Sequence, residues 1–234
     1  MRKVLLGFAG LAVALVAPLS AHAACVAPIS WGVTYATETN YAANISVAGS
    51  QLTIRGLIDC FNAPFADLDP TTKQYTVVIQ GLVSNGTVVT PLGGGFTEFK
   101  TVYSGAGTFA YYEDTTTPAD PANPPTYSDG TAILTGVLTH LTVDFTLGPT
   151  GSFVSGNFDT GPMGSGAAFT GGTLFDRVSN FGQGCPLRDT GGWNVSPNAH
   201  PAGYTAEVAG KTDIDCHPTA AESQTWGKSK AMYR

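Results

Sequence analysis

The sequence predicts an all-β protein: an antiparallel β-sandwich or barrel of about ten strands, with a loop-rich, disulfide-stapled C-terminal segment. Apolar and polar residues alternate along many short segments, turn-forming residues separate those segments, and no stretch sustains a 3.6-residue apolar period. The chain has 234 residues, of which 29 are glycine and only 12% are charged. Such a hydroxyl- and amide-rich composition suits strands and solvated turns better than helices.

The first 23 residues have the three parts of a cleavable secretory signal peptide. Arg2 and Lys3 provide the positive start, residues 4–17 are largely apolar, and Ala21-His22-Ala23 offers small residues to signal peptidase. The apolar run is shorter than the roughly 20 residues that a transmembrane helix needs. We therefore expect cleavage near Ala23 and a secreted or periplasmic product without a transmembrane anchor.

The charge of the mature chain argues against nucleic acid as a partner. Removal of Arg2 and Lys3 leaves nine basic residues against seventeen acidic ones, a net charge of −8. Phosphate binding needs a basic face, which this balance does not offer.

All four cysteines lie in the mature chain, and an even number in an exported protein predicts two disulfides. Three pairings are possible, and we favour Cys25–Cys60 and Cys185–Cys216 because each closes a short loop within one region. On the chain-entropy view each bond stabilises the fold by about 3–4 kcal/mol. A Cys/His metal site is the alternative, but the sequence has no CxxC pair.

Period-2 alternation defines the expected strands, with residues 24–184 as a β domain and 185–234 as the loop-rich segment packed on it. Thr131–Leu147 is the longest run. Its apolar residues should share one face: Ile133, Val137, Leu141, Val143, Phe145 and Leu147. Asn85-Gly86 predicts a tight hairpin turn. We expect an exposed proline-rich loop at residues 114–129 and a short helix at residues 220–232. The strand candidates are 31–37, 41–48, 51–59, 74–83, 96–103, 107–113, 131–147, 152–158, 168–175 and 204–208.

Two groups near the C-terminus are candidate sites. In an extended backbone Asp213, Asp215 and His217 project to one side, where they could bind a divalent cation. The alternative is that they simply face water while Cys216 faces the core. We expect no other cofactor, and no catalytic residue stands out.

The second group could bind a sugar, because it mixes aromatic rings with polar side chains. It consists of Trp193, Asn194, His200 and Tyr204. Aromatic residues beside a disulfide also often pack against it, so both readings stay open.

Three segments resemble the exported β-rich proteins of Gram-negative bacteria that often carry a PEP-CTERM sorting tail. They are GTFAYYED at 107–114, YSDGT at 127–131 and FTGGTLF at 169–175, and the resemblance covers residues 75–176. It implies a role in the envelope or extracellular matrix, linked to exopolysaccharide. Residues 226–234 lack the Pro-Glu-Pro motif, the apolar segment and the arginine cluster, so we expect no sorting by that route.

These observations favour a non-enzymatic envelope or extracellular-matrix protein that acts through surface contacts, with polysaccharide or other envelope components as partners. A carbohydrate-binding module is one alternative. A secreted hydrolase with carboxylates from distant strands is another.

Overall fold

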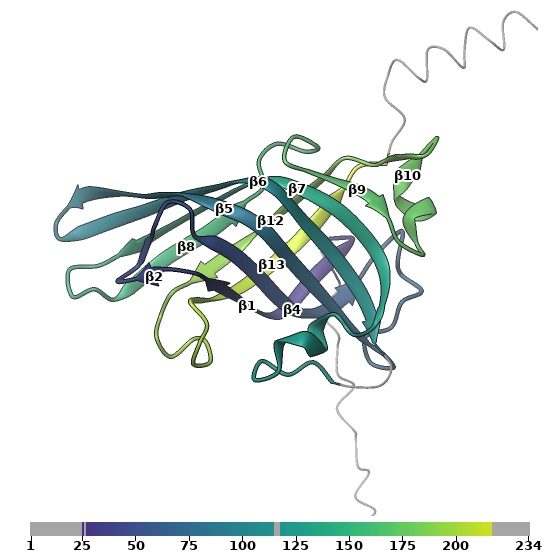
Figure 1. Cartoon of the computed structure of the whole chain (residues 1–234), viewed down its shortest axis with the longest axis horizontal. Helices are drawn as coiled ribbons and strands as arrows, with labels where there is room; N and C mark the ends of the chain where they lie inside the picture. Colours follow the sequence, from purple (N-terminus) through teal and green to yellow (C-terminus); the bar gives the residue numbers. More distant parts are fainter. Residues whose placement is uncertain (1–24, 26, 115–117, 217–234) are drawn as a thin grey trace, which may run out of the picture.

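The computed structural model describes residues 25, 27–114 and 118–216, and Figure 1 shows them as one β structure. The expected signal peptide, the expected helix at 220–232 and His217 lie outside the described residues. Nine antiparallel strands form the main sheet: β1 (Ile29–Glu38), β4 (Gln51–Phe61), β5 (Gln74–Gly93), β6 (Phe96–Asp114), β7 (Thr131–Leu147), β8 (Phe153–Asp159), β9 (Ala167–Gly171), β12 (Leu187–Asn194) and β13 (Ala206–Ile214).

Eight of these strands close into a barrel. The order is β6-β5-β4-β1-β13-β12-β8-β7, and β7 pairs again with β6. β9 joins β7 beside residues 135–138, whereas β8 joins it beside residues 142–147. The sandwich-or-barrel question is therefore settled in favour of a barrel.

Short elements fill the connections. They are the hairpin of β2 (Tyr41–Ala42) and β3 (Ile45–Ser46), the pair β10 (Ser179–Asn180) and β11 (Gln183–Gly184), and the 3₁₀ turns η1 (Pro124–Tyr127) and η2 (Phe175–Val178). No helix among the described residues is long and apolar enough to span a membrane.

The segment expected to be loop-rich contributes two barrel strands, β12 and β13. β13 pairs with β1 on one side and with β12 on the other. A boundary after residue 184 would therefore cut through the barrel wall. The apolar alternation of β12 and β13 is hard to see in the sequence because glycines, Gly191 and Gly210, occupy positions beside large interior rings.

Large side chains fill the barrel interior because glycines on neighbouring strands leave room for them. A Cβ atom on Gly210 would lie 2.7 Å from ring atoms of both Trp31 and Phe158. These two rings stack with centroids 5.4 Å apart. The interior is a packed core of the kind that small barrels form.

Two local expectations need correction. Asn85 and Gly86 do not form a hairpin turn: they lie inside β5, where the register with β6 shifts, and the chain turns at residues 94–95. Val137 is exposed, whereas Leu138 and Leu141 are fully buried, so β7 changes its inward-facing phase between them. A bulge in β6 at residues 105–106 lies opposite this change.

The proline-rich connection between β6 and β7 is partly docked on the barrel. Thr126 and Tyr127 are buried, and the Thr76 hydroxyl donates to the Tyr127 carbonyl at 2.7 Å. Tyr204 donates to the Pro121 carbonyl at 2.9 Å. Thr126 and Tyr127 thus anchor this connection to the barrel, while its prolines stay exposed or half-buried.

The disulfides are the two that loop length favoured. Cys25 pairs with Cys60 at a Cα–Cα distance of 5.9 Å, and Cys185 pairs with Cys216 at 5.0 Å. Cys25 and Cys60 lie near the start of β1 and the end of β4, and the second pair near the start of β12 and the end of β13. Both bonds therefore lie at the same end of the barrel.

Candidate functional site

Charge divides the two ends of the barrel. Strand directions bring segments 39–50, 84–97, 145–158 and 190–206 to one end, and none of these contains Asp, Glu, Lys or Arg. The opposite connections, 62–73, 118–130 and 160–186, carry seven such residues: Asp67, Asp69, Lys73, Asp120, Asp129, Asp176 and Arg177. We call the two regions the uncharged end and the charged end.

A pocket of about 380 Å³ opens at the uncharged end. Apolar Leu147, Phe153 and Val195 line it together with the polar side chains of Asn44 and Ser152. An apolar concavity with a few polar groups, at the mouth of a barrel, is a common form of ligand site.

A groove of about 360 Å³ adjoins this mouth pocket, and the two share Phe153. It forms because β8 and β12 pair only over Asn157–Asp159 and Thr190–Gly192, leaving the ends nearer the mouth without a shared ladder. Its lining includes Trp193, Asn194 and Glu207. Asn194 and Glu207 are directly opposite each other on β12 and β13, so they share the outer face.

A hydrogen-bonded cluster lies beside the uncharged end, where the β2–β3 hairpin meets the main sheet. Glu38 accepts hydrogen bonds from the hydroxyls of Ser46 and Tyr103, the latter at 2.9 Å. The Ser84 hydroxyl oxygen lies 2.5 Å from that of Ser46. Burial raises the pKa of the Glu38 carboxyl, and the two donors partly oppose the shift. The cluster ties the hairpin to β1, β5 and β6.

A second buried carboxyl belongs to Asp189, near the start of β12 at the charged end. Asp189 is 2% exposed, and burial raises its pKa to about 7. The Thr212 hydroxyl donates to it at 2.6 Å and lies 2.6 Å from the Tyr111 hydroxyl and 3.3 Å from Trp31 Nε1. Because Thr212 gives its single proton to Asp189, Tyr111 and Trp31 must be donors to Thr212.

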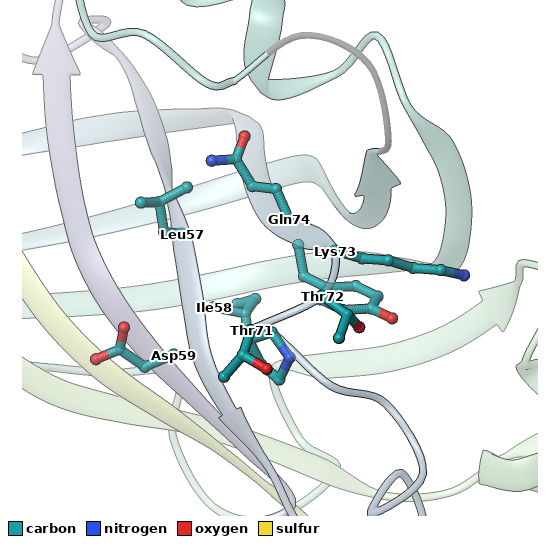
Figure 2. Close-up of a pocket in the computed structure, with 9 residues that line it drawn as sticks. Leu57, Ile58, Asp59, Thr71, Thr72, Lys73 and Gln74 are labelled. Carbon is teal, nitrogen blue, oxygen red and sulfur yellow. The ribbon is translucent and has the colours of Figure 1, made fainter. Parts of the chain in front are cut away.

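The charged end has a concavity of its own, shown in Figure 2. It measures about 410 Å³ and lies between β4 and the segment that leads into β5. Asp59 and Lys73 point in opposite directions there (Figure 2), and Lys73 forms an ion pair with Glu113 at 2.7 Å. Its two charged groups are therefore not directed at one common point.

The structure places two of the three expected metal ligands, Asp213 and Asp215, at the charged end. Asp213 forms an ion pair with Lys211 at 2.7 Å, Asp215 is exposed, and His217 lies outside the described residues. Among residues 25, 27–114 and 118–216, no three His, Cys, Asp or Glu side chains are grouped so as to hold a metal ion.

The expected ligand-binding residues separate into two groups. Trp193 and Asn194 line the groove. Tyr204 is buried against Tyr35, with ring centroids 5.1 Å apart, and His200 is half-buried in the loop before it. Tyr204 thus connects the barrel strands to this loop, Trp193 packs in the core with 3% of its surface exposed, and only Asn194 offers a partly exposed side chain to the groove.

Sequence reasoning missed Phe153 and Glu207, which complete the groove. They lie 40 and 14 residues from Trp193 and come together only through strand pairing. One sequence pattern could have linked these regions: segments 145–158 and 190–206, which lie at the same end of the barrel, both lack charged residues.

No family model matches the chain, and neither a curated protein nor a solved structure matches it at a significant level.

Proposed function

We propose that this chain is an exported, non-enzymatic protein of the cell envelope or extracellular matrix that acts through surface contacts, one of them with a polysaccharide. The groove where β8 and β12 separate carries this proposal. The ring of Phe153, the amide of Asn194 and the carboxylate of Glu207 line it, while Trp193, 3% exposed, borders it from the core. Apolar rings stack on sugar faces, and amide and carboxylate groups bind sugar hydroxyls.

Two further features support the export and the non-enzymatic role. Two disulfides indicate an oxidising compartment, in agreement with the signal-peptide pattern of residues 1–23. Among the described lining residues of the groove and the mouth pocket, Glu207 is the sole carboxylate. Glycosidases generally use two, so we prefer binding to hydrolysis.

The test is titration of the purified protein with neutral and acidic polysaccharides, followed by tryptophan fluorescence and calorimetry. Trp193 borders the groove from the core, so a ligand in the groove should change its emission by altering its surroundings. We expect Asn194→Ala and Glu207→Gln each to weaken binding by about tenfold, since each removes hydrogen bonds to the ligand.

Asp59→Asn, in the pocket of the charged end, is the matched control and should bind as the wild type does. Unchanged fluorescence and no heat with every polysaccharide would refute the proposal. Groove variants that bind a polysaccharide as tightly as the wild type would refute the assignment to this groove.

A further inference from the structure

We propose that the uncharged end also docks on a lipid bilayer surface, with the tips of the β5–β6 and β7–β8 hairpins inserted among the lipids. This inference goes beyond the polysaccharide groove and uses different residues. The long β5–β6 hairpin projects at the left of Figure 1, and the β7–β8 hairpin reaches the same side. A Cβ atom on Gly95 would lie 2.9 Å from Pro149, so the two tips are neighbours.

The two tips expose large apolar side chains. Leu92 is 55% exposed, Phe96 41% and Val154 52%. Val88 and Val89 are also exposed behind the first tip, at 65% and 44%. Val88 and Val89 are consecutive in β5, so they project from opposite faces of the hairpin.

The distribution of charge favours a bilayer as the occupant. Segments 84–97 and 145–158 contain no charged residue, and the first charges behind the tips are Glu98, Lys100 and Asp144. Glu98 is four residues from Gly94, which puts it about 13 Å behind the tip at roughly 3.3 Å per residue. That uncharged depth matches the headgroup and upper acyl region into which interfacial segments insert.

The shape of the tips separates a bilayer from other partners. A flat protein surface or a polysaccharide chain would cover one face of a projecting hairpin and leave the other in water. Lipids surround an inserted tip on all sides, which suits a hairpin with apolar side chains on both faces. Because the mature chain is acidic, with a net charge of −8, we expect neutral lipids to be preferred to anionic ones.

The experiment is flotation of the purified protein with phosphatidylcholine–phosphatidylethanolamine vesicles. We expect the wild type to float, and Leu92→Ser and Phe96→Ser each to lower the partition coefficient about tenfold. Phe181→Ser is the matched control: this side chain is 86% exposed but lies in the β10–β11 turn at the charged end. Its partition should equal that of the wild type.

Leu92→Trp adds a direct readout, since insertion should shift the tryptophan emission to shorter wavelengths and allow quenching by brominated lipids. A wild type that stays with the aqueous phase, or tip variants that float equally well, would overturn the proposal. Tip variants that instead dissociate a dimer in vesicle-free buffer would identify a second copy of the chain as the occupant. Tip variants should still bind polysaccharide, which separates this test from that of the groove.

Discussion

The Thr212 hydroxyl donates a 2.6 Å hydrogen bond to the buried Asp189 carboxyl, near the charged end of the barrel. Thr212 also receives hydrogen bonds from Tyr111 and Trp31, on strands β6 and β1. The Thr212 side chain, on β13, thus links β1 and β6 to the buried Asp189 carboxyl on β12. The arrangement makes the stability of the barrel depend on pH and on a single hydroxyl.

Asp189 should make the folded protein less stable as the pH rises. Burial raises its pKa from 3.8 to about 7, so the folded state holds this proton more tightly than the unfolded state. The stabilisation is complete below about pH 4, and a few kcal/mol are lost as the pH rises through 7. Asp189→Asn should remove this component, as measured by urea unfolding between pH 4.5 and 8.5. Asp129→Asn, on an exposed loop, should keep it. Parallel pH profiles for the wild type and Asp189→Asn would contradict this role.

Thr212→Val should destabilise the barrel by roughly 2–6 kcal/mol at neutral pH. The nearly isosteric side chain leaves the Tyr111 hydroxyl without its acceptor and Asp189 without its donor, at about 1–3 kcal/mol for each buried group. Because the Thr212 hydrogen bond lowers the pKa of Asp189, its loss should raise that pKa further. Thr212→Ser keeps the hydroxyl and should unfold near the wild-type urea midpoint. Equal midpoints for the valine and serine variants would show that the hydroxyl contributes nothing.

Gly191 and Gly192 are adjacent but should respond differently to alanine. A Cβ atom on Gly191 would lie 2.0 Å from the Ala209 carbonyl oxygen and 2.6 Å from Phe158, whereas the nearest atom to a Cβ on Gly192 is 3.9 Å away. Gly191→Ala should lower the free energy of unfolding by about 1–3 kcal/mol through overpacking. Gly192→Ala should leave it unchanged or slightly raised. Thermal unfolding of both variants tests this pair, and the reverse order would contradict the packing described here.

Removal of either disulfide should cost about 3–4 kcal/mol, because the closed loops of 35 and 31 residues are similar in length. The comparison needs two double variants, Cys25→Ser with Cys60→Ser and Cys185→Ser with Cys216→Ser. Urea unfolding in the absence of reductant measures each effect. A double variant with a wild-type unfolding midpoint would show that its bond does not stabilise the fold.

Much of the fold follows from local sequence, because alternation is a local property. It predicts β4 and most of β7 directly, and the even cysteine count predicts the two bonds. The phase change between Leu138 and Leu141 does not follow, since the bulge opposite it is on β6. Asn85-Gly86 also has two outcomes, a turn or a bulge, and the pairing of the whole β5–β6 hairpin decides between them.

The candidate site is less predictable than the fold. Trp193 and Asn194 could be picked out as polar-aromatic neighbours, but Phe153 and Glu207 reach them only through pairing between distant strands. Asp189, in the segment RDTGGWN, looks like a surface acid in the sequence. Its burial depends on Thr212, Tyr111 and Trp31, which are far away along the chain.

The first and last strands of the barrel, β1 and β13, pair antiparallel, so the start of β1 and the end of β13 lie at the same end of the molecule. Cys25 and Cys216 both lie at the charged end, so the described chain enters and leaves at one pole. The four connections at the other pole therefore lie away from Cys25 and Cys216. They can be exchanged or extended, as in a scaffold for displaying grafted loops, without disturbing the disulfide-bonded base.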